Sequence, residues 1–515
     1  MGKKENQSRL ERTLHPILYE VNARVLLQEL SATAGKDITL ATLPDSILDE
    51  WESLGFDAVW LMGVWTTGEM GVQIAREFPS LQEEYRKTLP DFTAEDVIGS
   101  PYAVQAYTVS PSIGGEKGMA ALRKRLAKRG IGLILDFVCN HTARDHSWVH
   151  EHPEYYVAGS AGEEIEKPEY CFKTTTVRGD RVLAFGRDPT YPGWSDTAQL
   201  NHRHPGTRKA LLETLENIAG LCDGVRCDMA MLVLQSVFER TWGDRAKPVD
   251  AEPEREEFWK EVISTVKSQY PNFVFIAEAY WNLEWELQQL GFDYTYDKRL
   301  YDRLLREGAW SVFEHLKADL EFQKRSVRFI ENHDEARAAK ALSSEAWQCA
   351  AATVIATVPG MVLLHDGQME GRKVKLPVQL RRRPEEAVSR HLRSFYEKVL
   401  SCVATPVFQK GTWKHLQPKP AWHDNYSWQN FLSFWWENDL GSARLVVVNY
   451  APQNGQCYID LSLDKITGSP VEFRDLMGDA VYVRERSGVS SKGIYFDLPG
   501  YGIHIFEVNA ARKPR

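Results

Sequence analysis

The chain has 515 residues, of which 43% are hydrophobic, and carries a formal net charge of −9 at pH 7. This length predicts one large domain with a smaller one beside it. The acidic balance argues against nucleic acid as a partner, since phosphate binding needs a basic face. The first residues lack a signal-peptide core and no apolar run could span a membrane, so we expect a cytoplasmic protein with no membrane partner.

Cysteine usage narrows the class of protein further. The chain has seven cysteines, and none of them forms a CxxC pair. The odd number and the scattered positions argue against a disulfide framework and against a zinc site. The sequence leaves the oligomeric state open.

Short apolar runs alternate with helical segments behind a polar, flexible N-terminus at residues 1–14. The runs that predict strands are residues 16–26, 55–62, 131–138, 221–228, 272–278, 291–294, 325–331 and 360–365. The segments that predict helices are residues 43–51, 117–130, 205–220, 255–269 and 385–400, whereas residues 66–100 read as a long polar excursion. Eight strands alternating with helices predict a parallel (β/α)8 TIM barrel.

The alternative fold is an open, doubly wound sheet. Such a sheet usually carries a glycine-rich phosphate loop directly after its first strand. No such loop follows Val25, so the barrel is the preferred interpretation.

Two stretches depart from the strand–helix rhythm. Residues 142–198 are rich in Gly, Pro, Thr and aromatic residues, and predict a lobe inserted after the third strand. Residues 403–515 show alternating strand patterns and turns, which predict a C-terminal antiparallel β-sandwich domain. The barrel would then consist of residues 15–141 and 199–402.

Charged residues end the apolar run of the fourth predicted strand. Residues two apart on a strand point to the same side, so Arg226 and Asp228 should face one space. The cation would keep the carboxylate ionised, which makes Asp228 a candidate nucleophile. A structural ion pair that closes the end of a barrel is the alternative, because such pairs also perturb ionisation.

Barrel enzymes place their chemistry at the carboxyl ends of the strands. The polar residues expected at those ends are Asp136, Asn140, His141, Arg226, Asp228, Glu278, Glu331, His333 and Asp334, with Tyr102 in the loop before the third strand. Several carboxylates, two histidines and an arginine at one mouth indicate a functional site. Either histidine alone would more readily be read as a structural residue.

The order of the strands suggests a reaction. Asp228 and Glu278 lie on neighbouring strands about 4.8 Å apart, which suits the carboxyl separation of about 5–5.5 Å in retaining glycosidases. Glu278 follows an apolar run, so burial should keep it protonated as a general acid. Asp334 would stabilise developing positive charge, and His141 and His333 would donate hydrogen bonds to sugar hydroxyls.

Four segments resemble signature regions of the α-amylase family, glycoside hydrolase family 13. They are Asp136-Phe-Val-Cys-Asn-His141, Gly224-Val-Arg-Cys-Asp228, Glu278 after its apolar strand, and Phe329-Ile-Glu-Asn-His-Asp334. The segments occur in the family's order, and the resemblance covers nearly the whole chain. It implies a (β/α)8 barrel with an inserted domain and a C-terminal β domain.

The resemblance also implies roles for individual residues. Asp228 would be the nucleophile, Glu278 the acid/base and Asp334 the transition-state stabiliser. Tyr102 resembles the ring that stacks on the sugar at the cleavage site. The supporting substrate-binding positions would be Arg226, His141 and His333. The substrate would be an oligo- or polysaccharide α-glucan, cleaved at α-1,4 bonds.

The chain departs from the family at several positions. Gln105 follows the tyrosine where many relatives carry Asp, and Met231 and Leu232 replace a Lys-His pair after the nucleophile. These changes affect the leaving-group side, so hydrolysis, glycosyl transfer, isomerisation and action on a small α-glucoside stay open. No cofactor is required by this chemistry, and calcium is the candidate metal, with Asn140 as the matching ligand position.

Two other classes of function compete with this reading. One is a non-catalytic carbohydrate-binding homologue, which would usually have lost a catalytic carboxylate, and none is lost here. The other is a metal-dependent barrel hydrolase, which would usually show His-x-His on the first strand. Residues 19–24 read Tyr-Glu-Val-Asn-Ala-Arg, so this class is set aside.

Overall fold

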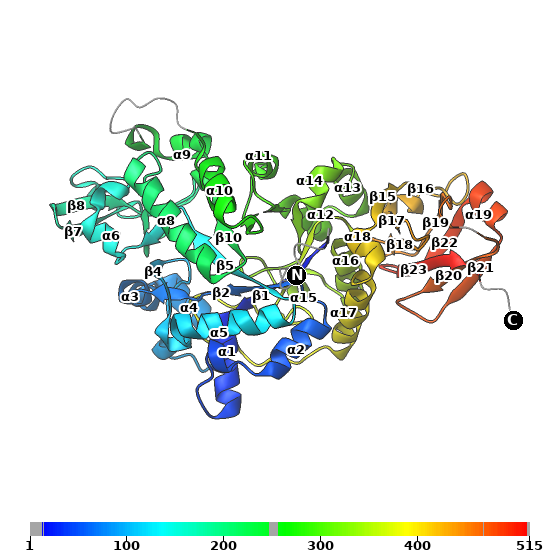
Figure 1. Ribbon diagram of the computed structural model, residues 1–515, viewed down its shortest axis with the longest axis horizontal. Coiled ribbons are helices and arrows are strands. Elements are labelled where there is room, and N and C mark those ends of the chain that lie inside the picture. Colours follow the sequence, from blue (N-terminus) through cyan, green and yellow to red (C-terminus); the bar gives the residue numbers. More distant parts are fainter. Residues whose placement is uncertain (1–12, 14, 247–255, 467, 512–515) are drawn as a thin grey trace, which may run out of the picture.

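The computed structural model describes residue 13 and residues 15–246, 256–466 and 468–511. The predicted flexible N-terminus at residues 1–14 therefore lies almost entirely outside the described residues. Helices and the barrel occupy the left and centre of Figure 1, and β-sheets occupy the right. None of the helices within the described ranges combines the length and the apolar character needed to cross a membrane.

Eight parallel strands close into a barrel, in which the last strand pairs with the first. In chain order they are β1 (Ile17–Asn22), β2 (Ala58–Met62), β5 (Gly132–Val138), β10 (Gly224–Asp228), β11 (Val274–Ala277), β12 (Tyr294–Tyr296), β13 (Ser326–Arg328) and β14 (Met361–His365). Closure confirms the predicted TIM barrel and shows that the open doubly wound alternative is wrong.

Helices cover the outside of the barrel and the connections around its mouth (Figure 1). Those up to the fourth strand are α1 (Ala23–Ala34), α2 (Asp45–Ser53), α3 (Glu69–Glu77), α4 (Pro79–Thr88), α5 (Gly115–Lys128), α6 (Ser147–Glu151), α7 (Glu163–Glu166) and α8 (Pro205–Leu221). Later ones are α9 (Gln235–Trp242), α10 (Phe258–Gln269), α11 (Glu284–Gln289), α12 (Lys298–Arg306), α13 (Ala309–His315), α14 (Leu320–Lys324), α15 (Ala338–Ala341), α16 (Glu345–Thr357), α17 (Arg390–Val403), α18 (Pro406–Lys410) and α19 (Arg486–Lys492).

The structure corrects three sequence expectations. The first strand ends at Asn22 and not at residue 26, because the Asn22 side chain accepts the Arg24 and Val25 N–H groups and starts α1. The polar excursion at residues 66–100 contains two helices, α3 and α4. The helix expected from residue 385 begins only at Arg390, after Ser389, whose hydroxyl caps it.

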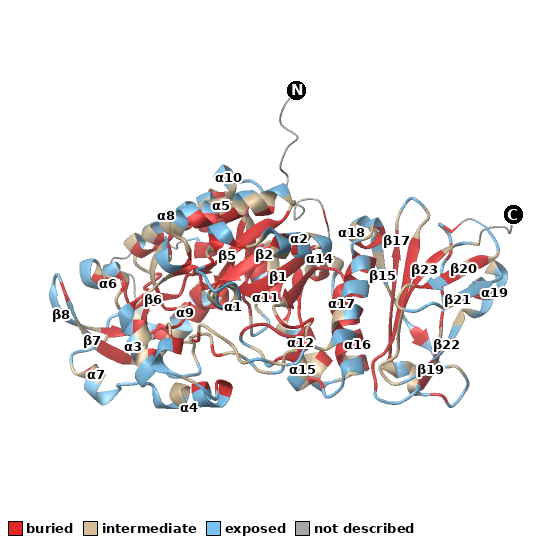
Figure 2. Ribbon diagram, turned by 90° about the horizontal axis from the view of Figure 1, so that it is seen from below, coloured by how far each residue is buried: buried red, intermediate tan, exposed pale blue. Residues whose placement is uncertain are grey.

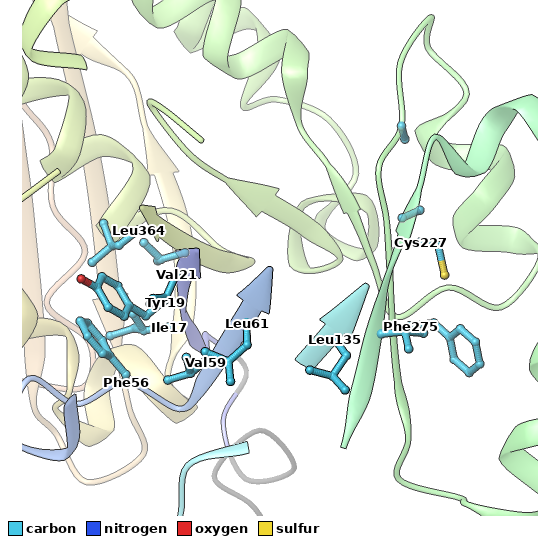
Figure 3. Packing of buried hydrophobic residues seen from close by; sticks show 14 of the residues in the cluster. Ile17, Tyr19, Val21, Phe56, Val59, Leu61, Leu135, Cys227, Phe275 and Leu364 are labelled. Atoms are coloured by element: carbon cyan, nitrogen blue, oxygen red, sulfur yellow. The ribbon is translucent and has the colours of Figure 1, made fainter. Parts of the chain in front are cut away.

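Strand alternation divides the barrel residues between two cores. Outward-facing side chains such as Tyr19, Val59 and Leu135 pack against the surrounding helices, and Figure 3 shows them with Phe56 from the loop before β2. Tyr19 stacks on Phe56 with ring centroids 4.5 Å apart. Inward-facing Trp60 is fully buried in the separate core that fills the barrel. In Figure 2 the barrel strands β1, β2 and β5 carry the colour of buried residues.

A lobe follows the third barrel strand. It contains the strand pair β6 (His141–Ala143) and β9 (Thr197–Gln199), and the hairpin β7 (Cys171–Thr176) with β8 (Gly179–Ala184). The short pair β3 (Trp65–Thr67) and β4 (Val104–Val109) lies in the connection after the second strand. Because β6 pairs with β9, the lobe leaves and rejoins the barrel at one place.

The C-terminal part forms two antiparallel sheets around a core of their own. The larger sheet has the order β15 (Thr412–Leu416), β17 (Phe431–Glu437), β18 (Ala443–Asn449), β23 (Ile503–Ala510), β20 (Val471–Asp475) and β21 (Val481–Arg484). The smaller sheet contains β16 (Pro418–Lys419), β19 (Gly455–Ile459) and β22 (Ile494–Leu498). The predicted β-sandwich is therefore confirmed.

Candidate active site

A single buried guanidinium joins the acidic residues at the mouth of the barrel. Arg226 Nη1 lies 2.7 Å from Asp228 Oδ1 and 3.5 Å from Asp136 Oδ1. Its Nη2 lies 2.8 Å from Glu278 Oε2, a charge contact outside hydrogen-bond geometry. Arg226 is fully buried, so these carboxyl groups are its compensation for lost hydration.

Aromatic rings enclose the guanidinium on its remaining sides. The Arg226 Cζ atom lies 5.1 Å from the ring centre of Trp60, 5.3 Å from that of Tyr102 and 5.7 Å from that of Tyr296. Ring faces attract a cation, and the attraction is stronger where water is excluded. The Trp60 indole N–H also donates to Asp136 Oδ2 at 3.1 Å, which fixes the carboxyl group at the bottom of the site.

The backbone at the end of β10 brings Glu278 to Asp228. Parallel pairing sets Cys227 opposite Ala277, and the Glu278 N–H donates to the Cys227 carbonyl at 3.0 Å. The chain then turns sharply at Met229, whose φ of 44° lies in the left-handed region. In that conformation the Met229 N–H donates to Glu278 Oε2 at 2.6 Å.

Glu278 therefore has an environment of its own. The Tyr280 hydroxyl donates to Oε1 at 2.9 Å, and the Met229 N–H occupies Oε2. Burial nevertheless raises the pKa of Glu278 to about 7, against the opposing charge of Arg226 and with help from the negative charge of Asp228. A carboxyl group with this pKa can both give and take a proton near neutral pH.

A second charged chain runs from the first strand to the seventh. His333 Nδ1 lies 2.6 Å from Glu20 Oε1, and Nε2 lies 3.0 Å from Asp334 Oδ2 and 2.7 Å from the Tyr102 hydroxyl. Burial by itself would lower the pKa of His333, but Asp334 and Glu20 outweigh burial and raise it to about 10. The ring is therefore an imidazolium that donates from both nitrogens.

Asp334 differs from the other two acids in exposure and ionisation. Its side chain is 46% exposed, whereas the side chains of Asp228 and Glu278 are 9% and 3% exposed. Burial of the group would raise the pKa of Asp334, but the His333 charge dominates and holds the pKa far below its usual range. Asp334 is thus a permanent anion at the solvent side of the mouth.

Two other residues expected at the mouth, His141 and Glu331, are held by neighbours of their own, and the charge of Asp228 still acts on His141. His141 lies on β6 with its ring 5.0 Å from Trp194, and burial lowers the pKa of His141 so that it is neutral. Within the described residues, no hydrogen bond joins His141 to Asp228, Glu278 or Asp334. Glu331 is bound by Arg337 at 2.5 Å and by the Ala338 N–H at 2.7 Å, which holds the loop after β13.

Sequence reasoning missed three partners of the central residues. Glu20 holds His333, and Trp60 and Tyr296 flank Arg226. A signal existed for Glu20, because a carboxylate inside an apolar strand must find a buried partner. For the two rings no such signal exists, since aromatic residues in strands are ordinary core residues.

The Asn140 side chain, which matches a calcium-ligand position, is paired with Gln199. Its side-chain oxygen accepts from Gln199 Nε2 at 3.0 Å, and its amide donates to Gln199 Oε1 at 3.2 Å. Calcium takes about six to eight oxygen ligands. The described part of the chain offers no group of three or more His, Cys, Asp or Glu side chains around a common point.

Replacing Glu20 by Gln tests the buried charge chain. The His333 pKa of about 10 exceeds its unfolded value of about 6.5. The pair of Glu20 with His333 therefore stabilises the fold fully below the unfolded pKa and loses this effect as pH rises through 10. We expect Glu20→Gln to reduce the free energy of unfolding by about 3–5 kcal/mol near neutral pH and by much less above the His333 pKa. Thermal unfolding at both pH values measures this difference.

Glu83→Gln is the matched control, because it breaks an exposed pair with Lys87 and should leave unfolding unchanged. An equal loss of stability for Glu20→Gln at both pH values would contradict the charged state assigned to His333.

Known proteins are similar to this chain in sequence and in fold. Residues 46–394 match the family model described as "Alpha amylase, catalytic domain". The chain is 24% identical over 369 residues to an α-amylase from Haloarcula japonica, a match that covers 69% of this chain and 44% of that protein. It is 27% identical over 300 residues to an α-1,4-glucan:maltose-1-phosphate maltosyltransferase from Rhodospirillum rubrum, covering 57% of this chain and 35% of that protein.

The chain thus matches less than half the length of these two relatives. The crystal structure of a maltogenic α-amylase from Thermotoga neapolitana has the same fold, with a TM-score of 0.66 and 19% identity over 96% of this chain and 99% of that one. Because the family model matches more than half of its residues, the chain belongs to the α-amylase family.

Proposed function

We propose that the protein is a retaining, α-glucan-active glycoside hydrolase that cleaves α-1,4-glucosidic bonds through a covalent glycosyl-enzyme intermediate. The observation that carries this proposal is the contact of one guanidinium with two carboxyl groups, at 2.7 Å from Asp228 and 2.8 Å from Glu278. Carboxyl groups on neighbouring strands that share one guanidinium suit the separation of about 5–5.5 Å found in retaining glycosidases, whereas inversion requires a wider gap that admits water.

The two carboxyl groups would act in sequence. Asp228 attacks the anomeric carbon while protonated Glu278 gives its proton to the departing glycosidic oxygen. The anomeric carbon–oxygen bond breaks and an ester to Asp228 forms. Glu278, now ionised, takes a proton from a water that attacks the same carbon, which frees Asp228 and releases the sugar with its original configuration.

The remaining residues would bind the sugar and its developing charge. Asp334 is an anion at the mouth, where it would stabilise an oxocarbenium-like transition state. The Tyr102 ring is stacked near His333, with centroids 5.2 Å apart, and would form the floor under the reacting sugar. His333 and His141 would donate to sugar hydroxyls, and Arg226 would keep Asp228 ionised.

Transfer to another acceptor is the second candidate function. Met231 and Leu232, directly after the nucleophile strand, are 0% and 3% exposed, so neither side chain offers the leaving group a polar contact. One relative is named as an α-1,4-glucan:maltose-1-phosphate maltosyltransferase, and another as a trehalose synthase/amylase. Action on a small α-glucoside is the third candidate function, and a carbohydrate-binding role without catalysis is the fourth.

We also propose the division of the chain into domains. Residues 15–141 and 199–402 would form the catalytic barrel, residues 142–198 the inserted lobe, and residues 403–515 the C-terminal β domain. The pairing of β6 with β9 supports the bounds of the inserted lobe. The separate core of the two C-terminal sheets supports a C-terminal β domain.

Product analysis with maltoheptaose tests the function. We expect the wild-type chain to release shorter α-maltosaccharides and Asp228→Asn to be slower by about a thousandfold or more, because it lacks the nucleophile. Asp223→Asn is the matched control just before the other end of the same strand, where an amide oxygen still accepts the Leu133 N–H and only a partly exposed pair with Arg123 is lost.

Parallel reactions with added glucose and phosphate separate the alternatives. Longer chains or glycosyl phosphates would identify a transferase. Equal rates for wild type and Asp228→Asn would contradict the assigned nucleophile, and an absence of any product would reject the hydrolase on this substrate.

The pH profile tests the role of Glu278. Its pKa of about 7 predicts that kcat/KM falls tenfold per unit at higher pH, since the acid must be protonated. Tyr280 donates to the ionised carboxylate and so favours it. We expect Tyr280→Phe to raise the Glu278 pKa and move this limb of the profile upward by about one pH unit.

Tyr85→Phe is the control, because the buried Tyr85 hydroxyl has no hydrogen-bond partner within the described residues. Movement of the alkaline limb to lower pH in Tyr280→Phe would contradict the assignment of Glu278 as the acid.

A further inference from the structure

A cavity of about 430 Å³ lies where the barrel helices meet the C-terminal sheets. Its barrel side is the turn from α12 to α13 with Trp310, together with Trp347 near the start of α16. Its other side comes from residues 429–430, residues 450–452 and Tyr501 of the C-terminal part. Figure 1 shows α12, α13 and α16 beside β15 and β17 at this seam. Arg226 and the three acids around it do not line the cavity.

Aromatic rings form the walls and are held in fixed positions. Trp347 and Tyr501 stack with centroids 5.5 Å apart and planes 10° apart. The Trp347 indole N–H donates to the Tyr450 hydroxyl at 3.0 Å, which in turn donates to the Leu304 carbonyl at 2.7 Å. Trp310 stacks on Phe313 with ring centroids 5.5 Å apart, and it is 48% exposed, so part of a held ring faces solvent.

Polar groups are available between the rings. The side-chain amides of Gln429 and Asn430 make no hydrogen bond within the described ranges, so each offers two donors and an acceptor to a ligand. Arg306 and Glu307, both exposed, stand at the rim with opposite charges. The net charge of the cavity is therefore close to zero.

These features select a neutral, polyhydroxylated ligand with flat apolar faces. A pyranose ring presents C–H groups to aromatic rings and hydroxyls to amides, whereas an anionic or cationic ligand would meet one repelling charge. The volume lies in the range of about 300–1,000 Å³ typical of ligand sites. We propose that this cavity is a second, non-catalytic binding site for an α-glucan chain, the choice of glucan resting on the proposed function.

Such a site would act through two-point attachment of a polymer. A long chain held at the seam stays close to the barrel mouth, which raises its local concentration there. A short oligosaccharide that fills only the active site gains nothing. The cavity should therefore lower KM for glycogen while leaving turnover of short substrates unchanged.

Affinity electrophoresis of the full chain in gels containing glycogen tests the proposal. The Asp228→Asn background prevents cleavage, and Trp310→Ala and Gln429→Ala are introduced into it. We expect each to weaken retardation by glycogen about three- to tenfold, and Trp310→Phe to restore most of it, because a ring is restored. Trp422→Ala is the matched control, since Trp422 is 55% exposed and lies outside the cavity lining.

The outcomes separate this proposal from the proposed function. Retardation that is unchanged in Trp310→Ala and Gln429→Ala, or reduced equally in Trp422→Ala, overturns the second site. Maltoheptaose turnover of Trp310→Ala with Asp228 intact reports on the active site alone and should match wild type. If the wild-type chain turns over no maltoheptaose but Trp310→Ala still weakens retardation by glycogen, the proposed hydrolase function is wrong on this substrate. The second binding site is then still supported.

Discussion

The buried cation of Arg226 is the constraint on which the mouth of the barrel depends. A guanidinium without water costs several kcal/mol unless carboxylates and rings surround it. The structure supplies Asp136, Asp228 and Glu278 on three neighbouring strands, and aromatic rings on the other sides. Loss of the cation would leave three acids facing one another in a dry space, so fold and site share one electrostatic balance.

Differences in surroundings give similar carboxyl groups different chemistry. Burial raises the pKa of Glu278 and of Asp136 to about 7 although Arg226 opposes it, whereas His333 holds Asp334 ionised. The His333 charge itself depends on Glu20, which is fully buried on the first strand. The difference between a carboxyl group with a pKa near 7 and a permanent anion is thus set by Arg226, Asp228 and His333 within the signature segments, together with Glu20 outside them.

Local periodicity predicted much of this arrangement. Alternation along residues 221–228 placed Arg226 and Asp228 on one side, and they form the 2.7 Å pair. The strand–helix rhythm predicted the closed barrel, whose eight strands all fall at or beside the expected runs. The Glu20–His333 contact joins residues 313 positions apart, and no local pattern encodes such a distance. The end of the first strand was missed because one asparagine cap outweighs a run of apolar residues.

Covalent trapping of the intermediate tests the central claim most directly. A fluorinated α-glucosyl fluoride slows hydrolysis of a glycosyl-enzyme ester, so that peptide mass spectrometry can locate the sugar. The account predicts one glucosyl unit on Asp228 in the wild-type chain and none in Asp228→Asn. A label on Glu278, or release of fluoride with no labelled peptide and a β-configured product, would contradict it.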